Sequence, residues 1–514
     1  MSFQGPGGKG KFPMRWTAKA CLSLILCEIL VFLPSCRKRA PVGAPPPARP
    51  EEISGLQSEL QKPYLELFEI SPNLRYSKKQ IDSTRHYLQK GEEYCVDQFK
   101  GHAEEYRTEI ANVQKGLKQR GSAIPEGERH EMHCKIQQLR VLESQATVLS
   151  QNAIPVAYDN RLAKLDLIES WPAQIQSIKA DIASGAYENR RWGDVKDIGY
   201  RDIEPNQRDD IRAGEEAIKQ MKQSGMMLPE IKDEAVVNYV KSVGEKVAKH
   251  SDLQVPLRIT MLNSKEINAF ALPGGYLFIE RGLLDAADDE AELAGVIGHE
   301  IAHVTARHSH KLMMKATIAS IFYQAAQIAA IVFTGGVAGI GTYYALQYGF
   351  YGLGLVLSLN LLGVSREYEL QADQLGVQYT WNAGYDPTGF TRFFDKIATK
   401  KGYVEGVSWF RTHPPFYTRM VDTQREIMFL PEKPNFVVTT DAFKQMKKAL
   451  AKVEKEVAKD EKNKPSLYDY SKEEGCAPLK KFEFEPDQPI EQLCHSPKLI
   501  TVEEASESDA QPNK

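Results

Sequence analysis

The pattern of hydrophobic and polar positions predicts that the first part of the chain is helical. Between residues 51 and 184, spaced Leu, Ile, Val and aromatic residues stand among charged ones at helical intervals, and glycines are few. The pattern is clearest in three segments, residues 79–118, 130–151 and 160–183. Breaks at 121–125 and 154–155 separate these segments, so we expect an antiparallel helical hairpin or a small bundle.

The pattern changes in the second part of the chain. Helical spacing at residues 207–225 and 233–250 gives way to short strand-like runs at 257–262 and 276–280. These runs lead directly into another helical stretch at 288–310. The fold class predicted is therefore α+β and mainly helical, with a small sheet ahead of a central helix.

The central helical stretch contains the motif His-Glu-x-x-His at positions 299–303. Residues four apart on an α-helix lie on one face, so His299 and His303 aim two imidazoles at one point. Glu300 is rotated by about 100° from His299 and can reach a water at a metal held there. Asp289, with Glu292 three residues later, resembles a capping box that starts the helix. The motif predicts a zinc site with Glu300 as a general base.

A catalytic zinc site needs a third protein ligand from elsewhere in the chain. The metzincin continuation is absent, because Ala306 and Ser309 stand where that motif has glycine and histidine. Glu369 and Asp373 share a helical face, so Glu369 is placed to bind the metal and Asp373 to accept an N–H from a zinc-bound histidine. Because Glu367 is also present, a solvated acidic face remains the alternative.

These motifs resemble those of the zinc peptidases that include the CAAX prenyl protease, the heat-shock protease HtpX and the periplasmic protease-chaperone BepA. The chain is most similar to the secreted, lipoprotein-like branch of this family, over roughly residues 208–430. The resemblance rests on four motifs in the family's order: Asn-Ala-Phe-Ala-Leu-Pro-Gly-Gly at 268–275, the motif at 299–303, Glu-x-x-Ala-Asp at 369–373, and His-Pro-Pro at 413–415 with Arg419.

The resemblance implies a gluzincin-type zincin fold with one zinc ion per chain. It makes His299, His303 and Glu369 the zinc ligands, Glu300 the general base and Asp373 a supporting acid. It also makes the segment at 268–272 a sheet edge that borders the cleft. The substrate-binding positions expected there are Asn268, Ala269, Phe270 and Ala271.

Two auxiliary residues, His413 and Arg419, belong to the last of the four motifs. Pro414 and Pro415 exclude a helix and hold His413 in an extended backbone. His413 could stabilise the oxyanion, or it could occupy the open position of zinc in a resting state. We favour the second role, because an extra imidazole near zinc competes with its water. A loop histidine that caps a carbonyl is the third possibility.

The predicted activity is hydrolysis of peptide bonds in extended or misfolded envelope proteins by a zinc endopeptidase. One alternative is a chaperone-like binder on the same fold with little proteolysis, against which the presence of Glu300 argues. A structural coiled-coil lipoprotein would leave the zinc motifs unexplained. The partners expected are polypeptide substrates, and a net charge of -3 over 514 residues gives no indication of nucleic-acid binding.

The first 36 residues have the pattern of an export signal, with a basic start and an apolar run at 20–32. The run is short for a membrane span and contains Glu28. It ends in Leu-Pro-Ser-Cys, which resembles a bacterial lipobox and makes Cys36 a lipidation site. The alternative is an uncleaved N-terminal anchor. Both predict attachment to a membrane of the cell envelope, with the remainder facing the periplasm.

The cysteines that remain after the signal and Cys36 are Cys95, Cys134, Cys476 and Cys494. An even number in an exported protein favours disulfides. We expect Cys95 to pair with Cys134 across the helical hairpin and Cys476 to pair with Cys494 in the tail. Free thiols are the alternative.

One stretch, residues 316–365, contains no charged residue. Its length permits two membrane spans, but its glycines and glutamines favour a buried or membrane-touching helical hairpin that covers the site. The domain organisation predicted is a signal at 1–36, a Pro-rich tether at 37–50, a helical domain at 51–200, a peptidase domain at 201–430 and a charged, partly disordered tail at 431–514.

Overall fold

The computed structural model describes residues 53–185, 205–223, 227–264, 267–315, 366–400, 417–461, 475–482, 494 and 497–501. The signal, the tether and the uncharged stretch at 316–365 lie outside these residues, so the expectations for them stay predictions. All described residues belong to one compact unit, Pro45–Lys514. Within them, no helix is both long enough and apolar enough to cross a membrane.

The first region is helical, as predicted from its spacing. Ser77 begins the longest helix with a complete capping box, in which Ser77 and Gln80 exchange hydrogen bonds, and Gly121 ends it with φ of 48°. The helices of this region are α2 (Ser54–Glu59), α3 (Tyr64–Ile70), α4 (Lys78–Arg120), α5 (Glu126–Val148) and α6 (Ile154–Ser184).

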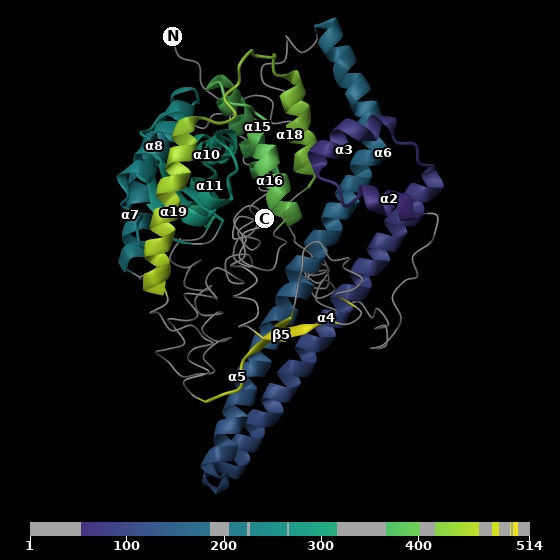
Figure 1. The fold of residues 1–514 in the computed structure, drawn as a ribbon, viewed down its shortest axis with the longest axis vertical. Helices are drawn as coiled ribbons and strands as arrows, with labels where there is room; N and C mark the ends of the chain where they lie inside the picture. Colours follow the sequence, from purple (N-terminus) through teal and green to yellow (C-terminus); the bar gives the residue numbers. More distant parts are fainter. Residues whose placement is uncertain are drawn as a thin grey trace, which may run out of the picture. The chain divides into compact units, whose positions relative to one another are not determined.

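Helices α5 and α6 follow one another along α4, which runs in the opposite direction (Figure 1). The break expected at 154–155 is only a π-helical turn, Leu149–Ala153. Pro155 lies in the first turn of α6, directly after this π-helical turn. Gly91 allows close packing within this hairpin, because a side chain there would meet the hydroxyl of Tyr158 at 2.7 Å.

The second region is the α+β fold expected, with a small sheet among helices. The helix expected at 207–225 is a 3₁₀ turn, Gln207–Asp210, followed by α7. The elements of this region are α7 (Ile211–Gln223), α8 (Glu234–Lys249), β1 (Arg258–Leu262), β2 (Ala269–Leu272), β3 (Tyr276–Glu280), α9 (Arg281–Ala286), α10 (Glu290–Thr305), α11 (His308–Lys315), α15 (Arg366–Asn382), α16 (Gly389–Lys400), α18 (Thr418–Phe429) and α19 (Asp441–Glu461).

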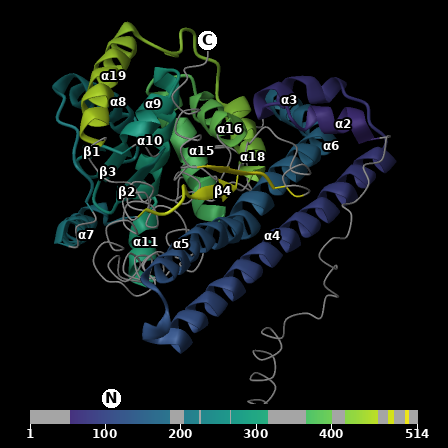
Figure 2. The ribbon, with the colours of Figure 1, turned by 60° about the horizontal axis from the view of Figure 1, so that its bottom comes forward.

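The sheet has the strand order β1–β3–β2, with β1 parallel and β2 antiparallel to β3. It lies against α8 and α10 (Figure 2). Strand β2 is therefore an edge, and the stacked rings of Phe270 and Phe278 hold it to β3. The amide of Glu280 donates to the carbonyl of Asn268 at 2.9 Å. Because main-chain groups alternate in direction along an antiparallel strand, those of Ala269 and Ala271 point away from β3.

Close packing of α10 against α15 positions the residues of the predicted zinc motifs. A side chain at Gly298 would meet the carbonyl oxygen of Gly376 at 2.9 Å. Near the start of α10, a side chain at Gly295 would meet the backbone of Phe390 at 2.6 Å. Glycine at these positions therefore lets α10 approach the backbones of α15 and α16 closely.

The helical region and the α+β region touch through buried side chains. The rings of Tyr64 and Tyr417 stack with centroids 6.1 Å apart. The Lys164 ammonium is buried nearby and donates to the carbonyl of Lys62 at 2.6 Å. Burial lowers the pKa of Lys164 to about 8, although the charge of Asp395 acts in the opposite direction.

Disulfides form, but the predicted pairing is wrong. Cys95 bonds to Cys494, and Cys134 bonds to Cys476. In an antiparallel hairpin, Cys95 lies roughly 39 Å from the turn along α4, whereas Cys134 lies roughly 12 Å from it along α5, so these two thiols cannot meet.

Within the described tail, α19 packs against α8, and the residues after it lie against the helical hairpin. Its strands β4 (Lys480–Phe482) and β5 (Leu499–Thr501) pair antiparallel. The side chain of Gln138 bonds both the amide and the carbonyl of Lys480, at 2.6 and 2.8 Å. These residues of the tail, which we expected to be partly disordered, are therefore ordered.

Candidate active site

Three buried side chains from two helices converge on one point. His299 and His303 from α10 and Glu369 from α15 each bring a potential ligand atom, and these atoms all lie within 4.8 Å of one another. The two Nε2 atoms are 3.0 Å apart, and the Glu369 carboxylate lies 3.6 Å from His299 and 3.5 Å from His303. Two imidazoles and one carboxylate are a donor set that catalytic zinc sites use, so these residues fit a zinc ion.

The start of α10 fixes the position of this motif in the chain. The side chain of Asp289 accepts from the amide of Glu292 at 2.9 Å. The side chain of Glu292 accepts in turn from the amide of Asp288, one residue before the cap. The predicted capping box is thus present with its second bond shifted by one residue, and Glu300 is held on α10 beside His299 with 1% of its surface exposed.

Asp373 and Arg419 support the ligand group from behind. Asp373 lies one turn after Glu369 on α15, and its Oδ1 is 2.9 Å from Nδ1 of His299. Arg419, from α18, approaches Asp373 through Nε at 2.5 Å and Glu369 through Nη1 at 2.9 Å. Burial acts to lower the pKa of Arg419, but the charges of Asp373 and Glu369 outweigh it and raise this pKa. The guanidinium therefore stays charged between the two carboxylates.

A further histidine, which the motif analysis did not include, completes the surroundings of His303. Nδ1 of His308 lies 2.9 Å from Nδ1 of His303, and Nε2 of His308 lies 2.9 Å from Oε1 of Gln371. The ring of His308 also stacks on Tyr368, with centroids 4.4 Å apart. His303 and His299 thus each present Nε2 to the ligand group and Nδ1 to a supporting side chain.

The backbone turn that places His308 lies at Arg307, which has φ of 56°. Both ends of its guanidinium bond the carboxylate of Asp210 at 2.7 Å, which holds the turn in place. The chain therefore leaves the α10 axis after His303 and returns His308 to the site. A regular helical spacing does not predict this return.

The predicted substrate edge lies next to α10. Ala271 of β2 packs in one cluster with Val304, the residue after His303. The hydroxyl of Ser309 donates to the carbonyl of Ala271 at 2.7 Å. The side chain of Asn268 donates to Glu280 at 3.1 Å, so it holds the start of β2 in place.

Two predicted site residues, Cys36 and His413, lie outside the described residues. Lipidation at Cys36 and the alternative roles of His413 therefore stay predictions. Of the auxiliary pair, the described residues include Arg419, at the back of the ligand group.

The match to known proteins covers the part of the chain that carries these residues. Residues 234–427 match the model for peptidase family M48. The chain is 28% identical over 223 residues to the beta-barrel assembly-enhancing protease of Yersinia pestis, which is 42% of this chain and 43% of that protein. It is 28% identical over 199 residues to the mitochondrial metalloendopeptidase OMA1 of Schizosaccharomyces pombe, which is 38% of this chain and 53% of that protein.

A shorter match extends to the metalloprotease LoiP of Escherichia coli, with 32% identity over 143 residues, which is 28% of this chain and 52% of that protein. The chain therefore spans about half or less of the length of these curated relatives. The resemblance that the sequence motifs indicated is confirmed. The chain carries a metallopeptidase domain of peptidase family M48.

Proposed function

We propose that the chain is a zinc-dependent endopeptidase that hydrolyses extended or misfolded polypeptides of the cell envelope. The observation that carries this proposal is the convergence of His299, His303 and Glu369 in front of the buried Asp373–Arg419 pair. This arrangement joins a metal-binding set to the groups that orient it. One zinc ion per chain is the expected cofactor.

Each side chain has a separate role in this proposal. His299, His303 and Glu369 hold the zinc ion, which when bound supplies a Lewis acid for peptide hydrolysis. Glu300 takes a proton from the attacking water and delivers it to the leaving amine. Asp373, whose Oδ1 lies 2.9 Å from Nδ1 of His299, holds the orientation of that imidazole.

The edge of the small sheet supports binding of an extended chain. The main-chain groups of Ala269 and Ala271 point outward from β2. Because Ala269 is buried at 0% exposure, we expect the cleft to open before a substrate strand adds there through main-chain hydrogen bonds. Ser309 already donates to the carbonyl of Ala271, which limits the added strand at that end. Recognition through main-chain groups is loose in sequence, as degradation of misfolded proteins requires.

The cell envelope is proposed on three grounds. The sequence begins with the pattern of an export signal that ends at Cys36, and one relative is named for the assembly of β-barrels. The described residues contain two disulfides, which suits an oxidising compartment. The membrane contact proposed is a lipid at Cys36 or an uncleaved N-terminal anchor.

The test is the variant Glu300→Gln, compared with the unmodified chain and with His303→Ala. We expect Glu300→Gln to keep one zinc per chain and the same unfolding temperature, while cleavage of an unfolded polypeptide falls by roughly a hundredfold or more. His303→Ala should lose zinc as well as activity. Metal analysis and a peptidase assay distinguish the three proteins.

Two outcomes would contradict the proposal. If Glu300→Gln still cleaves the polypeptide, Glu300 is not the general base. A zinc-loaded chain that binds unfolded polypeptides without cutting them would favour the chaperone-like alternative. If neither outcome occurs, comparison of the envelope proteins that accumulate in cells carrying Glu300→Gln identifies the substrates.

A further inference from the structure

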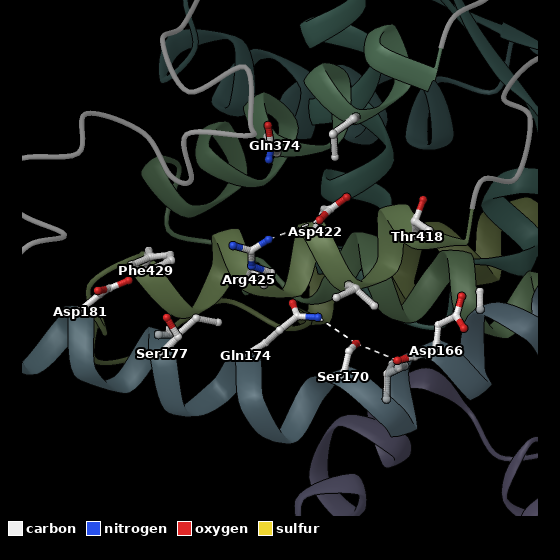
Figure 3. Close-up of a pocket in the computed structure, with 15 residues that line it drawn as sticks. Asp166, Ser170, Gln174, Ser177, Asp181, Gln374, Thr418, Asp422, Arg425 and Phe429 are labelled. Carbon is white, nitrogen blue, oxygen red and sulfur yellow. Dashed lines mark hydrogen bonds and ion pairs between the residues drawn. The ribbon is translucent and has the colours of Figure 1, made fainter. Parts of the chain in front are cut away.

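A groove of about 730 Å³ lies where the helical region meets the metallopeptidase domain. One wall is α6, and the other is formed by α18 with α15 behind it (Figure 3). The lining is mixed, with apolar residues such as Leu167, Ile178 and Val421 beside serine, glutamine and aspartate side chains. A groove of this size accommodates a segment of polypeptide.

The charges in the groove are mostly negative. Three carboxylates line it, Asp166 and Asp181 from α6 and Asp422 from α18, against one cation, Arg425. Arg425 lies 3.7 Å from Asp422 and is thereby partly neutralised within the groove. Arg85 pairs with Asp166 from outside the lining. After these two pairings one carboxylate, Asp181, remains in excess, and this negative charge favours a positively charged ligand.

The buried polar groups of the groove also call for a donor. Gln374 lines it with only 5% of its surface exposed, and among the described residues its Oε1 accepts no hydrogen bond. On the α6 wall, the side-chain amide of Gln174 already donates to the hydroxyl of Ser170, one turn earlier on the same helix. A buried acceptor without a donor is costly, so a ligand with N–H groups would gain by meeting Gln374.

The groove shares two helices with the zinc site. On α15, Leu370 and Gln374 face the groove, each one residue after a side chain that belongs to the site. On α18, Asp422 and Arg425 face the groove, whereas Arg419 reaches Asp373. The groove is therefore a neighbouring surface on the same helices and is separate from the ligand group.

We propose that this groove is an exosite that binds a basic segment of a polypeptide substrate. Asp166 and Asp181 lie toward the two ends of the α6 wall (Figure 3), and fifteen residues of helix place them roughly 22 Å apart. An extended segment of about seven residues spans this distance, with lysine or arginine side chains near both ends and main-chain N–H groups near Gln374. That the bound segment belongs to a substrate rests on the proposed peptidase activity. Binding of a basic segment in the groove does not depend on that activity.

The test measures binding without cleavage, in full-length protein that carries Glu300→Gln. The probe is a fluorescently labelled peptide of about ten residues with lysine near each end and alanine and serine elsewhere. Its counterpart carries glutamate in place of lysine. We expect the lysine peptide to bind with an affinity that falls as salt is added, and the glutamate peptide to bind at least about fivefold more weakly.

Substitutions in the groove then locate the binding. The double variant Asp181→Asn with Asp422→Asn should weaken binding of the lysine peptide by about fivefold. The matched control, Glu131→Gln with Glu216→Gln, removes two exposed carboxylates elsewhere and should leave binding unchanged. Ser177→Asp adds a carboxylate to the α6 wall and should tighten binding, so the test does not depend on a loss alone.

Three outcomes would overturn the exosite. They are equal binding of the two peptides, equal effects of the groove and control variants, and no tightening with Ser177→Asp. Because these measurements use the Glu300→Gln variant, their result does not depend on whether the chain cleaves polypeptides. A chain that binds the lysine peptide as expected but never cleaves a polypeptide would keep the binding site and refute only the endopeptidase.

Discussion

Arg419 and Asp373 form a buried two-point ion pair, in which Nε and Nη2 lie 2.5 and 2.6 Å from the two carboxylate oxygens. The pair joins α18 to α15 directly behind the predicted zinc ligands. Both side chains are nearly fully buried, Arg419 at 3% and Asp373 at 1% exposure. A pair of this kind orients the carboxylate that faces His299.

The first prediction concerns Arg419→Leu. Removing the guanidinium leaves Asp373 and Glu369 as uncompensated buried carboxylates, so we expect zinc affinity to fall about tenfold to a hundredfold. Competition with a chromophoric chelator measures this change. Unfolding of the metal-free protein should also become easier by about 3–5 kcal/mol, because a buried charge pair has lost one partner.

Arg425→Leu is the matched control for that experiment. Arg425 lies on the same helix as Arg419 but faces the groove, away from the ligand group. Its removal should leave zinc affinity unchanged. Equal zinc affinities for the two variants would show that Arg419 does not support the site.

The second prediction concerns His308→Phe. The phenyl ring keeps the stacking on Tyr368 but cannot accept or donate at the position of Nδ1. His303 then loses the partner of its Nδ1, and we expect zinc to bind roughly tenfold more weakly. The chelator competition above measures it, with His133→Gln, an exposed histidine of α5, as the control. Equal affinity in the two variants would make His308 a packing residue.

The third prediction concerns the edge strand. Ala269→Pro removes an outward N–H without breaking the ladder between β2 and β3, so KM for an unfolded polypeptide should rise while kcat changes little. Ala271→Pro, at the other outward position, should act in the same direction. Steady-state kinetics separate the two parameters.

Phe270→Pro is the contrasting variant. Phe270 pairs with Phe278, so the proline removes a hydrogen bond inside the sheet and should lower the unfolding temperature. If Ala269→Pro and Ala271→Pro also lower that temperature and leave KM unchanged, the substrate does not add to this edge.

The fourth prediction concerns the pH dependence of stability through Lys164. Its pKa is lowered to about 8 in the folded protein from 10.5, so the unfolded chain binds more protons between these values. Stability should therefore increase as pH rises from about 8 to 10.5, because the buried ammonium loses its charge. Below pH 8 both states are charged, and the unfavourable contribution is constant.

Lys164→Met isolates this contribution. The variant should lack the alkaline gain, so its stability relative to the unmodified protein is highest near neutral pH and declines toward pH 10.5. Urea unfolding at several pH values measures the difference. Parallel curves for the two proteins would mean that Lys164 does not titrate in this range.

The candidate metal ligands could be singled out from sequence because the spacing within each helix is local. Helical spacing alone puts His299 and His303 on one face of α10. It puts Glu369 and Asp373 on one face of α15. Only the meeting of the two helices had to come from the family resemblance. The expectation that residues 268–272 form a sheet edge also came from the family resemblance.

The features that sequence reasoning missed depend on turns and on register between distant segments. His308 returns to the site through the positive φ of Arg307, a conformation that no periodicity announces. The disulfide pairing depends on the alignment of two helices and on the path of the tail. The groove combines residues from α6 and α18 that are about 250 positions apart, and no motif marks them.

The two disulfides make the chain a closed covalent loop around its catalytic part. Cys134 and Cys476 enclose every residue of the metallopeptidase domain, and the bond between Cys95 and Cys494 closes a second, wider loop. A single cut between residues 134 and 476, by the chain itself or by another protease, therefore releases nothing. The nicked protein keeps its mass on a denaturing gel and separates into two pieces only after reduction, so self-cleavage would be invisible without a thiol.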